Sequence, residues 1–174
     1  MEKNCREEEK NITCCFSGHR MEKLPWRANE DDARCLALKT ALHQSLHRAY
    51  EAGYRRFLCG MATGCDMYFC EAVIALRDAC PDVILEAVVP FRGQPDRWKD
   101  TLKTRYAALL EQSDRVTVLR ELYTSNCMME RNYYMVNHST RLIAAYRGIT
   151  GGTMKTILYA TRSGLQIDRI SVPE

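Results

Sequence analysis

Three glycines lie between an apolar run and the expected start of a helix, at Gly148, Gly151 and Gly152. The run at 142–146, LIAAY, predicts a buried strand, and a helix is expected from Thr153. Free backbone N–H groups and the helix dipole attract anions at such a helix start, and glycine lets a phosphate approach closely. The pattern supports a phosphate-binding hypothesis. An ordinary strand–turn–helix connection is the alternative interpretation.

A second loop, GMATGCD at 60–66, follows another short apolar run and precedes another helix. Its candidate ligand-binding residues are Gly60, Ala62, Gly64 and Asp66. Asp66 could contact a ribose hydroxyl, or it could be a first-turn acid that favours the helix dipole. Glu71, further along this helix, is a weaker catalytic candidate, and a structural or solvated role is the simpler interpretation.

Two more segments supply polar side chains. The first strand is expected at 12–16 and ends in the candidates Ser17, Gly18, His19 and Arg20. A helix expected at about 126–137 brings two further candidates. They are Arg131, whose guanidinium could hold a phosphate with two hydrogen bonds, and Asn132.

Strands and helices alternate along the chain, which predicts a doubly wound α/β fold of the Rossmann-like type. We expect a mostly parallel sheet of about five to six strands with helices on both faces, because the strands are near-continuous apolar runs. The predicted strands lie at 12–16, 56–59, 83–89, 115–119, 142–146 and 166–170. Ligands of such sheets bind beyond the carboxyl ends of the strands, so the candidate loops should converge there.

The bulk properties set limits on domain organisation and partners. Of the 174 residues, 1–11 are expected to be a loose N-terminal tail and 12–174 one domain. The net charge of +3 is too small to indicate nucleic acid, although it does not exclude it. No apolar run approaches the ~18 residues of a membrane span, and the charged start shows no secretory signal. We therefore expect a cytoplasmic protein with no membrane partner.

Nine cysteines are present, which is an odd number, and no two have C-x-x-C spacing. Reduced thiols in the cytosol fit this pattern best, and neither a metal site nor a cofactor is indicated. Cys65 lies near a predicted helix start, where its pKa could be lowered. Redox sensing at Cys65 is therefore an alternative to a buried structural thiol.

Four stretches in order resemble the SLOG superfamily, named for Smf/DprA and the lysine-decarboxylase-like LOG proteins, and within it the YpsA-like family. They are FSGHR with LPW at 16–26, GMATGCD at 60–66, PF with Gln94 and Trp98, and MERN at 129–132 followed by GGT at 151–153. The resemblance implies a Rossmann-like fold that binds a nucleotide or a nucleotide-derived molecule. It also implies that Arg131, Gly151, Gly152 and Thr153 line the phosphate or ribose side.

LOG enzymes hydrolyse the N-glycosidic bond of nucleoside monophosphates with an arginine and a glutamate. Arg131 matches the arginine, but Thr156 stands where the resemblance would place the glutamate. A threonine cannot act as a carboxylate. The expected function is therefore nucleotide binding or sensing. The N-glycosidase alternative needs Glu71, Asp66 or Glu130 as the missing carboxylate.

A DprA-like protein that binds single-stranded DNA is the second alternative, and the small charge and the lack of a concentrated basic stripe argue against it. The helix segment at 128–136 is rich in Met and Tyr. It is a candidate homodimer contact, or it is simply part of the core.

Overall fold

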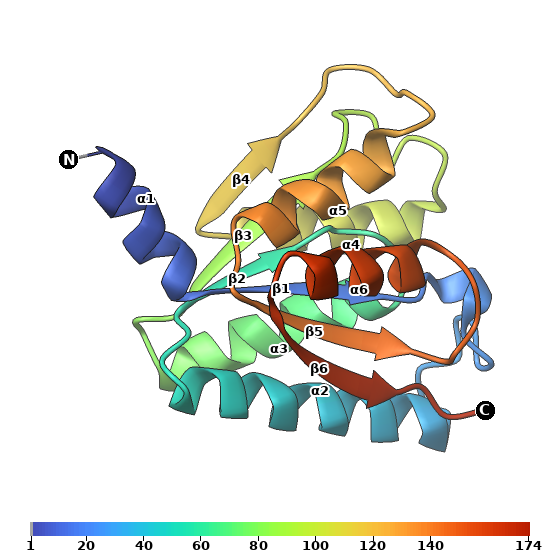
Figure 1. Ribbon diagram of the computed structural model, residues 1–174. Coiled ribbons are helices and arrows are strands. Elements are labelled where there is room, and N and C mark those ends of the chain that lie inside the picture. Colours follow the sequence, from blue (N-terminus) through green and yellow to red (C-terminus); the bar gives the residue numbers. More distant parts are fainter. Residues whose placement is uncertain (1) are drawn as a thin grey trace.

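The computed structural model describes residues 2–174, with side chains from residue 7 onward. Its six strands form one sheet in the order β4-β3-β2-β1-β5-β6, and every neighbouring pair is parallel (Figure 1). The strands are β1 (Thr13–Gly18), β2 (Arg56–Cys59), β3 (Ile84–Val89), β4 (Arg115–Val118), β5 (Arg141–Tyr146) and β6 (Gln166–Ser171). The predicted parallel α/β sheet is thus confirmed.

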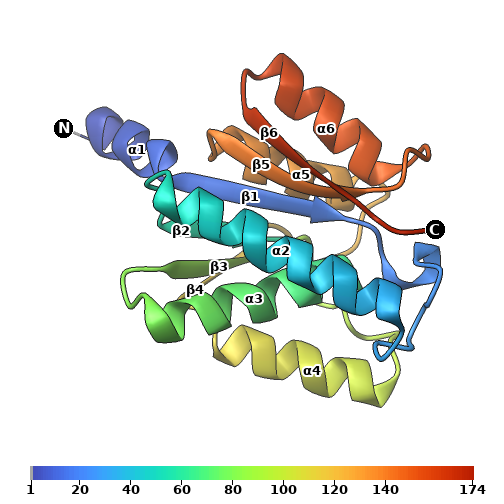
Figure 2. The ribbon, with the colours of Figure 1, turned by 90° about the horizontal axis from the view of Figure 1, so that it is seen from below.

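Helices cover both faces of the sheet, as predicted. α2 (Ala33–Glu51), α3 (Cys65–Ala79) and α4 (Asp100–Glu111) lie on one face, and α5 (Cys127–Asn137) and α6 (Gly152–Arg162) on the other (Figure 2). A short 3₁₀ helix, η1 (Met21–Lys23), follows β1. None of the described helices is long and apolar enough to cross a membrane.

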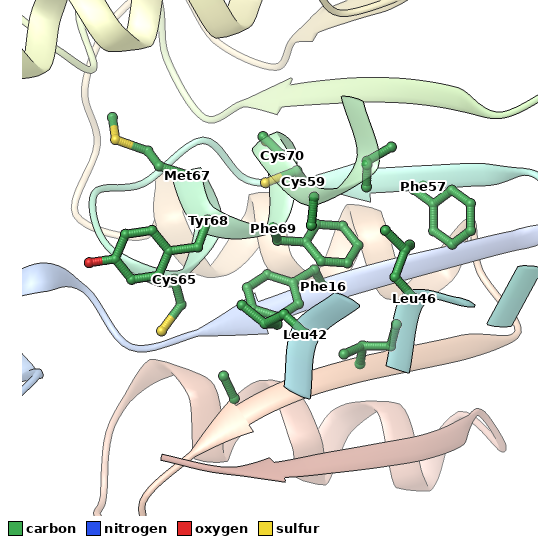
Figure 3. Packing of buried hydrophobic residues seen from close by; sticks show 14 of the residues in the cluster. Phe16, Leu42, Leu46, Phe57, Cys59, Cys65, Met67, Tyr68, Phe69 and Cys70 are labelled. Atoms are coloured by element: carbon green, nitrogen blue, oxygen red, sulfur yellow. The ribbon is translucent and has the colours of Figure 1, made fainter. Parts of the chain in front are cut away.

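Two apolar cores hold these layers on the sheet. In the larger core, the rings of Phe16 and Phe69 stack with centroids 4.4 Å apart, and Phe57 meets Phe69 edge-on (Figure 3). The smaller core packs Met135 of α5 and Ile157 of α6 against the other face. Because Phe16 lies two residues before the end of β1, this packing holds the part of the strand that leads into the following loop.

The first residues differ from the expected loose tail, since α1 spans Glu2–Asn11. Strong helix formers fill its last turns, in the run EEEK at 7–10. Glu9 anchors this end through ion pairs of 2.5 Å with Arg115 and 3.5 Å with Arg56. The arginines hold the pKa of Glu9 below its usual value.

The order of the strands places a topological switch point beside β1. From β1 the chain adds β2, β3 and β4 on one side, and then returns to place β5 and β6 on the other. The loops after β1 and β5 therefore leave the sheet in different directions, which opens a crevice between them. Ser17 and Ala144 are register partners in the β1–β5 pair at this edge.

Candidate anion-binding site

A cavity of about 210 Å³ opens at the carboxyl end of β1, at the switch point. Four segments far apart in the sequence meet around it. The lining residues are Phe16, Ser17, Gly18, His19, Arg20, Lys23, Ala62, Asp66, Met128, Met129, Arg131, Asn132, Gly152 and Thr153. The loops at the carboxyl ends of the strands therefore converge as predicted. Of the predicted ligand-binding residues, all but Gly60, Gly64 and Gly151 line the cavity.

The N-terminus of α6 forms one wall. Its N-cap residue is Gly151, which has no side chain to cap the helix. The N–H of Lys155 donates to the carbonyl of Gly151 at 3.1 Å. The N–H groups of the preceding helical residues, Gly152 and Thr153, therefore lack the intrahelical partner that later residues have. They add partial positive charge to the cavity wall.

Arg131 brings a buried guanidinium to the same cavity, with 5% of its surface exposed. Nε donates to the Asn132 side-chain oxygen at 2.8 Å, and Nη1 donates to the Gly60 carbonyl. Burial lowers the pKa of Arg131, which Asp66 partly offsets. Among the described residues, Nη2 has no hydrogen-bond acceptor. A buried cation with spare donors is expected to favour an anionic ligand.

Asp66 carries the only carboxylate among the residues that line the cavity. Its Oδ2 accepts the N–H of Ala62 at 3.0 Å and lies 3.8 Å from Nη1 of Arg131. Burial raises the pKa of Asp66, while Arg131 and the Ala62 N–H act in the opposite direction. Because 3.8 Å is longer than a hydrogen bond, this carboxylate neutralises the guanidinium of Arg131 only partly.

Thr156 is buried and connects α5 to the start of α6. The Asn132 side-chain nitrogen donates to the Thr156 hydroxyl at 2.8 Å, and that hydroxyl donates to the Gly152 carbonyl at 2.9 Å. Because Asn132 also accepts from Arg131, one chain of hydrogen bonds runs from the guanidinium to the α6 terminus. Thr156 therefore sets the relative position of the two parts that could hold an anion.

His19 joins the two glycine-containing loops. Its carbonyl accepts the N–H of Cys65 at 3.1 Å, at the start of α3. Its imidazole Nε2 accepts the backbone N–H of Arg147 at 3.1 Å, in the loop before α6. Burial lowers the pKa of His19, with Lys23 and Arg147 adding to the effect, and the accepted hydrogen bond requires an unprotonated Nε2.

Further cations lie at the rim. Arg20 and Lys23 are exposed and line the cavity, and no carboxylate of the described side chains forms an ion pair with either. A side chain built on Gly151 would meet the Lys23 amine at 2.8 Å, so Lys23 reaches over the α6 turn. The sequence interpretation missed Lys23, together with Phe16, Met128 and Met129. Because Lys23 follows Arg20 by three residues, its position in the sequence could have indicated that it lies beside the same site.

Two of the three glycines outside the lining, Gly60 and Gly64, support it instead. The Gly60 carbonyl accepts from Arg131 and from the Gln94 amide, the latter at 3.4 Å. Gly64 is the N-cap of α3 with φ +85°, and an added side chain would strike the backbone nitrogen of Met21 at 2.6 Å. A side chain built on Gly60 would overlap the Arg131 guanidinium, so this loop needs glycine at both positions although neither contacts the cavity.

Two proposed carboxylates lie elsewhere. Glu71 forms an ion pair with Nε of Arg105 at 2.7 Å, between α3 and α4. Glu130 forms an ion pair with Arg120 at 2.5 Å on the outer side of α5. Neither lines the cavity, so the structure does not place Glu71 as a catalytic group of this site.

The thiol of Cys65 is fully buried, and burial raises its pKa. The lowered pKa considered for a redox role is therefore wrong, because desolvation of the thiolate outweighs the helix start. Among the described residues, no group of three or more His, Cys, Asp or Glu side chains is placed to hold a metal ion.

Comparison with known proteins gives one family. A family model described as the YspA SLOG family, YpsA, matches residues 14–168. The prophage-derived protein YoqJ of Bacillus subtilis is 29% identical over 122 residues, covering 63% of this chain and 71% of YoqJ. The UPF0398 protein YpsA of the same organism is 25% identical over 131 residues, covering 74% of this chain and 73% of that protein.

Two solved structures share the fold. DNA processing protein A from Helicobacter pylori, whose structure is described for its single-stranded DNA binding mode, superposes with a TM-score of 0.63 at 12% identity. This chain is covered over 98% of its length, and that chain over 68%. DNA processing protein A from Streptococcus pneumoniae superposes with a TM-score of 0.60 at 16% identity, and the match covers 95% of this chain and 51% of that one. At these identities the likeness shows the fold alone.

Proposed function

Because the chain belongs to the YspA SLOG family, we propose that it binds a phosphate-bearing, nucleotide-derived small molecule in the cavity beside β1. One observation carries the proposal. The uncapped N-terminus of α6 and the buried guanidinium of Arg131 line the same cavity. Two independent anion-attracting features at a topological switch point form the arrangement in which doubly wound sheets bind phosphates.

The size and lining of the cavity favour part of a nucleotide. Its volume of about 210 Å³ is below the ~300–1,000 Å³ of a pocket for a whole drug-sized ligand. We assign it to the phosphate and the sugar, with Asp66 as acceptor for a sugar hydroxyl. Met128 and Met129 add an apolar side, and thioethers make favourable contacts with aromatic rings such as a nucleobase.

We propose binding or sensing without LOG-type hydrolysis. Thr156 occupies the place of the LOG glutamate, and its hydroxyl is engaged by Asn132 and Gly152. Asp66 is the one lining carboxylate, and it is held by the Ala62 N–H and by Arg131. Incubation with nucleoside monophosphates should therefore release no free base above the uncatalysed level. Release that Asp66→Asn abolishes would favour the N-glycosidase instead.

The experiment for binding is calorimetric titration with AMP, ADP-ribose, NAD and cyclic nucleotides. A saturable heat for at least one phosphate-bearing compound supports the proposal. Absence of binding by the entire panel contradicts it.

Single-stranded nucleic acid is the second candidate partner, favoured by the rim cations Arg20 and Lys23, which have no ion-pair partner among the described side chains, and by the fold shared with DNA processing protein A. The depth of the anion-binding groups counts against it, since Arg131 is buried and a strand would meet only the rim. A gel shift at low salt that weakens steeply as salt rises would support this candidate.

Free cysteines support a reducing location. The eight cysteines with described side chains are all free, and seven of them are buried. We propose a cytoplasmic protein on this ground, because disulfides persist in oxidising compartments. Fractionation of cells that express the tagged chain tests this location, and recovery outside the cytoplasm contradicts it.

A further inference from the structure

A second cavity opens at the same edge of the sheet, at the carboxyl ends of β3 and β4. Its volume of about 770 Å³ lies within the ~300–1,000 Å³ of sites for small organic ligands. Residues within 91–98, in the loop after β3, form one wall, and residues 121–123, in the loop after β4, form the other (Figure 1). This lining shares no residue with that of the anion cavity beside β1.

Three aromatic rings line the second cavity, on Phe91, Trp98 and Tyr123. Phe91 of one wall meets Tyr123 of the other edge-on, with centroids 5.4 Å apart. Trp98 meets Tyr106 of the larger core edge-on, also at 5.4 Å, which fixes its ring. Tyr123 is 64% exposed, so much of its ring is free to contact a ligand. Aromatic rings offer faces and edges to a further ring, and the lining therefore favours a planar aromatic group.

The charges of this lining cancel. Arg92 forms an ion pair of 2.8 Å with Glu121, which links the two walls. Arg97 and Asp96 add one charge of each sign. A phosphate would meet no net positive charge here, in contrast to the cavity that contains the buried guanidinium of Arg131. The second cavity is therefore better suited to an uncharged ring than to another anionic group.

The two cavities are neighbours. Gln94 lines the second cavity, and its side-chain nitrogen donates to the Gly60 carbonyl at 3.4 Å. The same carbonyl accepts a hydrogen bond from Arg131, which lines the anion cavity. The segment that leaves the second cavity at Tyr123 enters the lining of the anion cavity at Met128. A single peptide carbonyl thus separates a lining group of one cavity from a lining group of the other.

We propose that one ligand spans both cavities and carries a second aromatic ring, as a dinucleotide does. Its phosphates and one sugar lie beside Arg131 and the start of α6, and the ring of its other half lies among Phe91, Trp98 and Tyr123. The inference rests on the proposed function, because the anion cavity holds the charged part of the same molecule. The volumes agree with this division, since about 210 Å³ takes a phosphate and a sugar and about 770 Å³ takes a nucleoside-sized group.

The test is a calorimetric comparison of diadenosine diphosphate with ADP-ribose, which carries a hydroxyl in place of the second adenine. We expect the native chain to bind diadenosine diphosphate at least about tenfold more tightly, because stacking of one base on aromatic side chains contributes an effect of this size. Tyr123→Ala should reduce this ratio of affinities at least about fivefold. Tyr123→Phe keeps the ring and should keep the ratio.

Tyr133→Ala is the matched control, since Tyr133 is also an exposed tyrosine, at 37%, and lines neither cavity. It should leave the ratio as in the native chain. Circular dichroism of each variant shows whether it has folded.

Two results overturn the inference and leave the proposed function standing. One is equal affinity of the native chain for diadenosine diphosphate and ADP-ribose. The other is a ratio that a folded Tyr123→Ala variant leaves unchanged, because the second adenine then lies elsewhere. If AMP, ADP-ribose and diadenosine diphosphate all fail to bind, the proposed function fails and this inference fails with it. Binding of ADP-ribose thus distinguishes the two failures.

Discussion

The side-chain amide of Asn132 donates a 2.8 Å hydrogen bond to the hydroxyl of Thr156. Thr156 stands where the resemblance to LOG enzymes would place their glutamate, and this hydrogen bond gives it a structural role. The Thr156 hydroxyl also donates to the carbonyl of Gly152, at the start of the helix that lines the cavity. This arrangement supports the proposal that the site holds an anion, and the position has no carboxylate to support hydrolysis.

Removing the Thr156 hydroxyl should destabilise the protein. Thr156→Val keeps the shape but leaves the amide of Asn132 without its acceptor in a buried place. We expect the free energy of unfolding to fall by about 1–3 kcal/mol. Urea denaturation measures it, and Thr156→Ser, which keeps the hydroxyl, is the control. Equal stability of the valine and serine variants would show that this hydrogen bond does not contribute to the stability of the fold.

Adding a methyl group at Gly60 should displace Arg131. A side chain built there overlaps the guanidinium, whose Nη1 donates to the Gly60 carbonyl. We expect Gly60→Ala to weaken nucleotide affinity by at least about tenfold, which is ~1.4 kcal/mol. Calorimetric titration of the variant measures this loss.

A double-mutant cycle separates this mechanism from general damage to the loop. In an Arg131→Ala background the guanidinium is absent, so Gly60→Ala should have little further effect on affinity. If the two losses simply add, Gly60 acts on the site by some route other than Arg131.

Stability should depend on the protonation of His19. Burial and the neighbouring cations Lys23 and Arg147 lower its pKa, so the unfolded chain takes up the proton more readily than the folded chain. This contribution to stability is present above the unfolded pKa of about 6.5 and is lost as pH falls through that value and below. The hydrogen bond from the Arg147 N–H is lost with it.

His19→Gln provides the comparison, since the glutamine side-chain oxygen can accept the same N–H but does not titrate. The native chain should lose stability relative to this variant between about pH 7.5 and about pH 5.5. An unchanged difference between the two proteins over this range would contradict the role assigned to His19.

Much of the fold could be predicted because local rules and tertiary packing agree. Apolar runs such as LIAAY at 142–146 became strands almost where expected, and the carboxyl-edge rule gathered Ser17, Asp66 and Arg131 around one cavity. The contacts that could not be predicted depend on the path of the loops and on how the helices pack. The contact of His19 with Arg147 joins residues 128 positions apart. The engagement of Glu71 by Arg105 depends on how α3 packs beside α4.

The most direct test of the central claim compares AMP with adenosine in calorimetric titrations of the native chain and two variants at Gly152. An added side-chain atom there meets nothing within 4 Å, so Gly152→Asn and Gly152→Asp fit equally and differ in charge. We predict that the native chain binds AMP more tightly than adenosine. The aspartate should weaken AMP affinity at least about tenfold more than the asparagine does, because its carboxylate competes for the helix N-terminus. Equal binding of AMP and adenosine, or equal effects of the two variants, would contradict an anion site at the start of α6.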